Sequence, residues 1–258
     1  MSPRTRIAVQ IQPQHATYSE LRGAAVEAED AGVDIVFTWD HFYPLSGDPD
    51  GYHFEAWTLL SAWADATSRV ELGHLVTANS YRNPDLLADM ARTVDHISGG
   101  RLILGIGAGW FERDYDEYGY EFGTPGTRLA DLADALPRIK RRWARLNPPP
   151  TRDIPILIGG GGERKTLRLT AQYANTWHGF GDAETLIHKN AVLDRWCAEI
   201  GRDPSEIERS TSTRRPPSLA ADDLVKAGIG LVVIPMEARN KDAAFAVVRQ
   251  WLEWRDAA

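Results

Sequence analysis

The feature that most constrains this 258-residue chain is a repeated alternation between short apolar runs and longer amphipathic segments. The short runs are rich in β-branched residues and predict strands at 7–11, 33–38, 70–77, 102–107, 155–159, 175–177, 207–212 and 230–234. The longer segments predict helices at 18–31, 55–66, 84–97, 126–146, 163–173, 183–200, 219–227 and 241–255. Such an alternation over about 250 residues is typical of an α/β fold, the TIM or (β/α)₈ barrel. An open doubly wound sheet is the alternative, because local periodicity does not show whether a sheet closes.

The sequence also limits the number of domains, the kinds of partner and the location of the protein. The stretch Asn-Pro-Pro-Pro at 147–150 reads as a stiff return from a helix to a strand, so we predict one domain over residues 1–258. A net charge of -7 without a basic run disfavours nucleic acid and anionic membranes as partners. No apolar stretch reaches the roughly 18 residues of a membrane span, and the start reads as a strand rather than a signal peptide. We therefore expect a cytoplasmic protein.

The sequence gives no support to a disulfide, a zinc site or a nucleophilic hydrolase. The single cysteine, Cys197, lies in a helical pattern and has no partner for an internal disulfide. No Cys/His cluster has the spacing of zinc ligands, so we expect no metal site. No Gly-x-Ser-x-Gly elbow is present, and nucleophilic hydrolysis has no support.

Two strand ends carry histidines. Asp40 and His41 follow the second predicted strand among aromatic residues, where a titratable imidazole could face a ring-shaped ligand. The alternative is a loop histidine with ordinary polar contacts. In the third strand, Gly73 suggests a bulge or a close backbone approach. His74 then points either into the barrel mouth or into helix packing, and a satisfied core histidine is the simpler interpretation.

Two further strand ends are rich in glycine. The segment 105–112 reads GIGAGWFE, and its alternating glycines would let a flat ligand lie against the backbone, although a tight turn explains them as well. It lacks the third glycine of the dinucleotide fingerprint. The segment 158–166 reads IGGGGERKT and opens a helix, so its backbone N–H groups, with Arg164 or Lys165, predict an anion site. A flexible loop is the alternative, and the absence of Walker spacing disfavours a nucleotide triphosphatase.

Together these segments resemble the bacterial luciferase-like monooxygenase family. The resemblance rests on Asp40-His41-Phe42, LGHLVT at 72–77, NPDLLA at 83–88, TVDHISGGRL at 93–102, the two glycine-rich segments and GRDPSEI at 201–207. The motifs are most similar to the actinobacterial branch that uses coenzyme F420, a deazaflavin. The resemblance implies a TIM barrel that binds a flavin or deazaflavin across the mouth formed by the carboxyl ends of its strands.

The resemblance also implies roles for individual residues. It implies that the phosphate tail meets Gly159, Gly160, Gly161 and Gly162, and that a cis peptide bond at His74–Leu75 buttresses the central ring of the cofactor. The residues implied to line or cover that ring system are Thr77, Gly107, Ala108, Gly109, Trp110 and Trp177.

The chain departs from the family pattern at three places. The sugar-phosphate dehydrogenase branch has a tryptophan where this chain has Leu45 and an acid where it has Trp110, so the substrate and proton-transfer residues of that branch do not carry over. The stretch 123–150 lacks a long lid insertion, which implies a more open pocket or one completed by a second subunit.

The leading hypothesis is an enzyme, an oxidoreductase that moves a hydride between coenzyme F420 and a small organic substrate. In this hypothesis His41 transfers the proton, Asp40 orients it, and Glu112 is a second candidate acid. One alternative is an FMN-dependent two-component monooxygenase; another is a non-catalytic barrel that only binds the flavin or deazaflavin. The family resemblance also suggests a homodimer.

Overall fold

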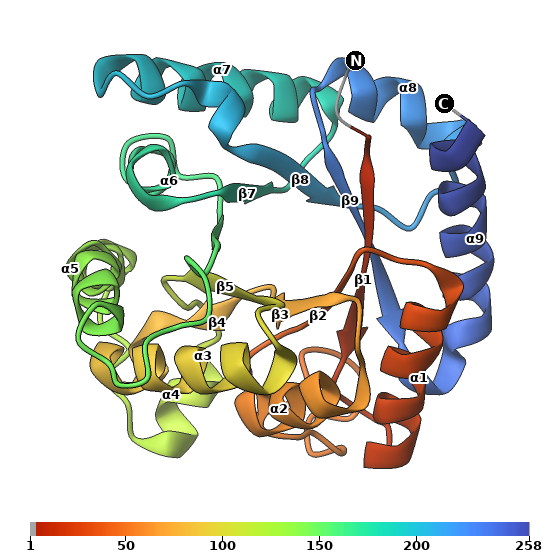
Figure 1. Cartoon of the computed structure of the whole chain (residues 1–258), viewed down its shortest axis with the longest axis horizontal. Helices are drawn as coiled ribbons and strands as arrows, with labels where there is room; N and C mark the ends of the chain where they lie inside the picture. The colour runs from red at the N-terminus through yellow and green to blue at the C-terminus, as the bar shows by residue number, and fades with distance from the viewer. Residues whose placement is uncertain (1–3, 258) are drawn as a thin grey trace.

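The computed structural model describes residues 4–257 and shows a barrel of parallel strands surrounded by helices (Figure 1). The strands are β1 (Arg6–Gln12), β2 (Ile35–Thr38), β3 (Glu71–His74), β4 (Thr77–Ala78), β5 (Leu102–Gly107), β6 (Ile156–Gly159), β7 (Thr176–Gly179), β8 (Glu208–Ser212) and β9 (Leu231–Glu237). The helices are α1 (Tyr18–Ala31), α2 (Ala56–Ala66), α3 (Pro84–Ser98), α4 (Glu112–Tyr118), α5 (Pro125–Trp143), α6 (Thr166–Tyr173), α7 (Ala183–Glu199), α8 (Pro217–Lys226) and α9 (Lys241–Ala257). Short 3₁₀ turns lie at Asn79–Tyr81, Pro204–Glu206 and Ala238–Asn240.

The sheet closes on itself, which confirms the TIM barrel and excludes the open sheet. β1 pairs in parallel with both β2 and β9, and neighbouring strands follow in chain order around the ring. β3 and β4 share one of the eight barrel positions, because both pair with β5. The segment 70–77, predicted as one strand, is therefore interrupted at Leu75 and Val76. Helix α4 was not predicted, because its seven residues are too few for a clear periodic pattern.

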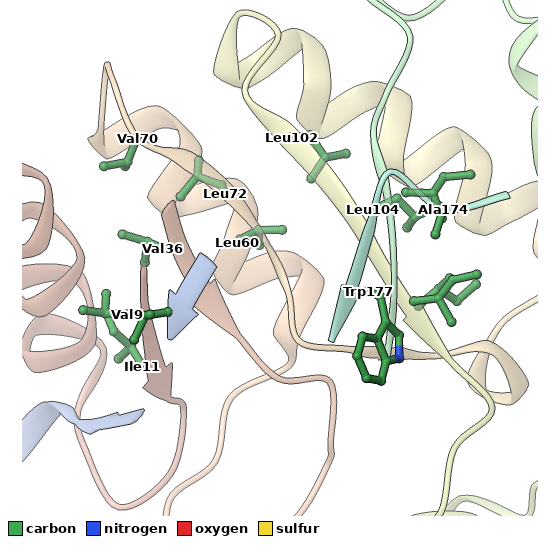
Figure 2. Close-up of a cluster of buried hydrophobic side chains, with 14 of the residues drawn as sticks. Val9, Ile11, Val36, Leu60, Val70, Leu72, Leu102, Leu104, Ala174 and Trp177 are labelled. Carbon is green, nitrogen blue, oxygen red and sulfur yellow. The ribbon is translucent and has the colours of Figure 1, made fainter. Parts of the chain in front are cut away.

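Side chains alternate between two apolar layers along the strands, as the period of a strand requires. Val9, Val36 and Leu72 point outward and pack with helix residues such as Leu60 (Figure 2). A smaller cluster of strand residues fills the barrel interior: Ala8, Ile35, Phe37, Leu75, Ile103, Leu157, Leu231 and Val233. The interior is thus packed with side chains at this level, and a cavity can form only nearer the barrel mouth.

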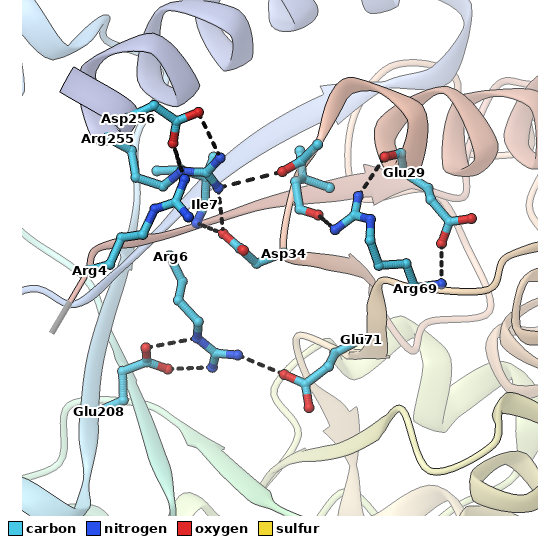
Figure 3. A network of polar contacts seen from close by, with 12 residues as sticks. Arg4, Arg6, Ile7, Glu29, Asp34, Arg69, Glu71, Glu208, Arg255 and Asp256 are labelled. Carbon is cyan, nitrogen blue, oxygen red and sulfur yellow. Dashed lines mark hydrogen bonds and ion pairs between the residues drawn. The ribbon is translucent and has the colours of Figure 1, made fainter. Parts of the chain in front are cut away.

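The barrel end that holds the amino ends of the strands is closed by ion pairs (Figure 3). Arg6 of β1 donates two hydrogen bonds to Glu208 of β8, at 3.0 and 2.7 Å, and a third to Glu71 of β3 at 2.7 Å. Arg255 of α9 bonds Asp34 at 3.0 Å and so ties the last helix to the start of β2. These contacts hold the amino ends of the strands together. No helix within residues 4–257 is long and apolar enough to cross a membrane.

Candidate functional site

A cavity of about 560 Å³ lies at the barrel end where the strands terminate. Its wall takes residues from the ends of β1 to β7, from the first half of α5 and from the start of α6. Ligands of parallel barrels bind at this end. The lining includes nine of the residues predicted for the site: Asp40, His41, Leu75, Gly107, Ala108, Gly109, Trp110, Gly159 and Gly160.

His41 is held by a buried aspartate from a distant part of the chain. Its Nδ1 lies 2.7 Å from Oδ2 of Asp114 in α4, and the Tyr81 hydroxyl donates to the same oxygen at 2.7 Å. The amides of Phe42 and Tyr43 donate to the other oxygen, Oδ1, at 3.1 and 3.2 Å. An ionised carboxylate only accepts, so Nδ1 carries the proton and Nε2 is the ring atom left for a ligand. Burial and the bond to Asp114 raise the pKa of Tyr81, which stays a neutral donor.

Asp40 has a different partner from the one expected. Its carboxylate forms a two-pronged ion pair with Arg82, at 2.5 and 3.0 Å, and accepts a hydrogen bond from the Thr77 hydroxyl. Burial alone would raise the pKa of Asp40, but the Arg82 guanidinium outweighs it and holds this pKa below its usual range. The prediction that Asp40 orients His41 is therefore wrong, and Asp114 does so instead.

Aromatic and apolar side chains surround His41. The ring centroids of Trp39, Trp110 and Phe111 lie 6.2, 5.8 and 5.5 Å from that of the imidazole, all edge to face. Leu45 lines the same cavity. Trp110 is 63% exposed, so it forms part of the rim rather than the floor. We call this part of the cavity, made by Trp39, His41, Leu45 and Trp110, the His41 end.

A second part of the cavity holds a positively charged side chain. Gly160, Thr166 and Arg128 line it. Arg128 donates from Nε to the carbonyl oxygen of Gly109 at 3.1 Å and from Nη1 to that of Phe122 at 2.8 Å, and it has no carboxylate partner within residues 4–257. In the part of the chain that the structure describes, no backbone carbonyl accepts from the N–H groups of Gly161 and Gly162. We call Gly160, Thr166 and Arg128 the Arg128 end.

The glycines of β5 are explained by packing as well as by the cavity. A Cβ at Gly105 would lie 1.8 Å from the carbonyl oxygen of His74, and one at Gly107 would lie 2.8 Å from Cγ2 of Val76. Side chains at these positions would push away the segment between β3 and β4. That segment contains a cis peptide bond at Leu75–Val76, so the prediction of His74–Leu75 was wrong by one bond.

Several predicted residues lie outside the cavity lining. Trp177 is fully buried in the layer between strands and helices, where its Nε1 donates to the Gly160 carbonyl at 2.8 Å, so it does not cover a bound ring. Its neighbour His178 lines the cavity in its place. Glu112 is exposed in the first turn of α4, which contradicts its role as a second acid in the site.

The remaining predicted residues lie close behind the wall. His74 is buried against Trp57, with ring centroids 4.5 Å apart, and burial lowers its pKa. His74 is therefore a core histidine, but not the satisfied one expected, because neither ring nitrogen has a hydrogen-bond partner in the described part of the chain. Thr77 acts behind the wall through Asp40, and Gly161 and Gly162 lie beside the lining rather than in it.

Sequence reasoning missed three polar residues of the site: Asp114, Arg128 and His178. Burial lowers the pKa of His178 to about 3, so the ring is neutral, and Ser210 contacts its Nδ1 at 2.9 Å. Asp114 and Arg128 occupy helical segments that look like ordinary charged surface. No local sequence pattern marks them as site residues. Asp114, for example, is 73 residues from its partner His41 in the sequence, and the two meet only in the folded chain.

Comparison with known proteins gives a family match over most of the chain. The model of the luciferase-like monooxygenase family matches residues 4–224. A putative coenzyme F420-dependent oxidoreductase of Mycobacterium tuberculosis is 31% identical over 179 residues, which cover 58% of this chain and 48% of that protein. The chain thus spans about half the length of this curated relative.

Solved structures share the fold. An F420-dependent secondary alcohol dehydrogenase in complex with an F420-acetone adduct is similar with a TM-score of 0.83 and 17% identity, over 95% of this chain and 97% of that one. A type II Baeyer-Villiger monooxygenase of Pseudomonas putida in complex with FMN has a TM-score of 0.66 and 17% identity, over 81% of this chain and 66% of that one. At these identities the likeness concerns the fold alone.

Proposed function

The chain belongs to the luciferase-like monooxygenase family, and on that basis we propose that it is an oxidoreductase that uses coenzyme F420. The observation that carries the proposal is the division of one cavity into two ends. Within residues 4–257, one end holds an oriented histidine without a partner at Nε2, and the other holds a cation without a carboxylate partner, beside the unbonded N–H groups of Gly161 and Gly162. A cofactor with a redox-active ring and a phosphate tail needs both.

The residues of the Arg128 end fit a phosphate. Arg128 is pre-oriented by two carbonyl oxygens and by the Phe122 ring, whose centroid lies 4.0 Å from the guanidinium carbon. Gly160, in the loop before α6, has a φ of 122°, a conformation that favours glycine. Thr166 adds a hydroxyl at the same place, and helix amino ends favour anions.

The strand ends between the two ends of the cavity fit a flat ring. Gly107, Ala108, Leu75 and Val76 line this part of the wall, which is largely apolar and lacks bulky side chains at its glycines. Gln10 donates from Nε2 to the Leu75 carbonyl at 2.8 Å, which fixes the wall and leaves Oε1 as an acceptor. When bound, the cofactor would supply or take up a hydride, and that chemistry is its own.

The protein would contribute the proton and the orientation of the substrate. His41 would deliver a proton from Nε2 to a substrate oxygen, or take it up in the reverse direction, while Asp114 holds Nδ1–H. A histidine held by a buried carboxylate keeps one tautomer and one orientation. The surrounding aromatic rings would exclude water from the reacting atoms.

An FMN-dependent monooxygenase is the second candidate, because the same fold is found with FMN bound in a solved structure. Titration of the purified protein with F420 and with FMN, read by tryptophan fluorescence, separates the candidates. The proposal expects tight binding of F420. Exclusive binding of FMN would favour the monooxygenase, and binding of neither would contradict both. Binding of F420 without turnover of any alcohol or carbonyl compound would favour the non-catalytic alternative.

A further inference from the structure

The charged groups around His41 are all paired within the protein. Among the cavity residues, Asp40 is neutralised by Arg82, which also bonds Glu55 at 2.8 Å. His41 is paired with Asp114. His178 contacts two serine hydroxyls, at 2.9 and 3.2 Å, and is a neutral ring. The cation without a carboxylate partner, Arg128, belongs to the other end of the cavity.

The titratable side chains that pack behind the His41 end are also either paired with an opposite charge or uncharged. Arg113 bonds Asp50 at 2.6 Å and lies over the Tyr43 ring. His53 accepts a hydrogen bond from Trp39 at 3.1 Å, and burial lowers its pKa to about 4, so it carries no charge at neutral pH. A charged ligand group placed beside His41 would therefore find no counter-ion.

The wall of the His41 end is apolar as well as uncharged. Trp39, Leu45 and Trp110 present rings and methyl groups, and the imidazole Nε2 is the polar atom left between them. A ligand carboxylate in such surroundings loses its hydration without gaining a partner, which is unfavourable. A neutral ligand group meets no such loss, because a hydroxyl can donate one hydrogen bond to the bare Nε2 and a carbonyl oxygen can accept one from Nε2 when the ring is doubly protonated.

We propose that the His41 end selects uncharged, largely apolar carbonyl compounds, or the alcohols that correspond to them, as substrates. This inference rests on the proposed function and specifies the substrate class of the same site. In the reducing direction a hydride from the cofactor would add to the carbonyl carbon and a proton from His41 to the carbonyl oxygen, which gives the neutral alcohol. The oxidising direction returns both to the cofactor and to His41.

Three ligands that differ at one substituent test the inference. Acetophenone, phenylglyoxamide and phenylglyoxylate carry a methyl, a carboxamide or a carboxylate on the carbonyl carbon. Because the carboxylate of phenylglyoxylate is attached directly to that carbon, it must lie beside His41 when the carbonyl oxygen contacts Nε2. F420 and FMN binding is measured first, and the three ligands are then titrated calorimetrically into the complex that forms. We expect acetophenone and the amide to bind and the carboxylate to bind roughly tenfold more weakly than the amide.

The amide controls for size and polarity, so the ratio of amide to carboxylate reports charge alone. A carboxylate that binds as tightly as the amide overturns the inference and leaves the proposed function intact. Failure of all three ligands to bind the cofactor complex also overturns it. A protein that binds neither cofactor overturns the proposed function and this inference with it.

A variant pair locates the selection at the His41 end. Leu45→Lys would place a cation beside His41 and should reverse the preference, so that phenylglyoxylate binds roughly tenfold more tightly than the amide. Leu219→Lys, at an exposed position of α8, adds the same charge away from the cavity and should keep the ratio of the parent protein. Circular dichroism confirms that each variant is folded. An unchanged ratio in folded Leu45→Lys contradicts the assignment of the substrate to this end.

Discussion

The two ends of the cavity differ in whether their charged groups are paired within the protein. At the His41 end every charge is paired inside the protein, and one ring nitrogen is left for a ligand. At the Arg128 end a cation has no carboxylate partner within residues 4–257, and the N–H groups of Gly161 and Gly162, beside the lining, donate to no backbone carbonyl of the described chain. The difference indicates that the first end positions a proton in apolar surroundings, whereas the second recognises an anion.

The largest expected effect is the loss of proton transfer at the His41 end. His41→Ala should lower turnover by roughly 10²–10⁴-fold, the usual contribution of a general acid or base, with little change in cofactor affinity. His41→Asn is the control, because it keeps a polar side chain that does not titrate near neutral pH. Steady-state kinetics and a cofactor titration measure the two quantities. Equal losses in both would make His41 a cofactor-binding residue.

The next effect tests whether Asp114 acts through His41. Asp114→Asn should lower turnover roughly hundredfold, because the amide no longer fixes the Nδ1–H tautomer. The ring ¹⁵N chemical shifts of His41 should show a mixture of tautomers in the variant and one tautomer in the parent. Tyr81→Phe removes one hydrogen bond from the same carboxylate and should have a much smaller effect. Normal tautomer signals together with lost turnover would show that Asp114 does not work by orienting the ring.

At the other end, the expected effect is on affinity. Arg128→Gln keeps two hydrogen-bond donors but removes the charge, so cofactor affinity should fall roughly tenfold to hundredfold and lose much of its salt dependence. Arg138→Gln is the matched control, since Arg138 lies on the same helix and pairs with Asp85 at the surface. Affinity that depends on both arginines alike, or on neither, would argue against a phosphate at the Arg128 end.

The smallest effect concerns stability at low pH. The pKa of His178 is lowered to about 3 in the folded protein, so below about 6.5 the unfolded chain binds a proton that the native ring does not. Stability should therefore fall with pH, by about 2 kcal/mol between pH 7 and pH 5 from this residue alone. Urea unfolding of His178→Asn should show a correspondingly shallower decline. His188→Asn, at an exposed histidine, should decline as the parent does.

Much of the fold could be predicted from the sequence, because strand and helix periods are local properties. Helix α1 and strand β5 have the predicted bounds, and helix α3 differs by one residue. The caps that fix α3 are short-range signals too: Asn83 accepts from the Asp85 amide, and Gly99 ends the helix with a φ of 65°. The glycine-rich segment at 158–162 was also correctly placed at a strand end, with Gly159 and Gly160 in the cavity wall.

The errors concern register and distant contacts. A one-residue shift exchanges the faces of a strand, so Trp177 was assigned to the cavity although His178 points there. The partner of His41 could not be deduced from its neighbours in the sequence. Asp40 is adjacent to His41 but pairs with Arg82, whereas the actual partner, Asp114, lies on helix α4, which the sequence did not predict. The homodimer and the cytoplasmic location stay predictions.

A crystal structure of the chain with bound F420 or FMN tests the two-ended cavity most directly. The account predicts that the phosphate lies within hydrogen-bond distance of Arg128 and the loop at Gly160, and that the redox-active part of the ring lies against Leu75, Val76 and Gly107 and faces His41. A phosphate bound among Trp39, Leu45 and Trp110, or a cofactor bound outside this cavity, would contradict the account.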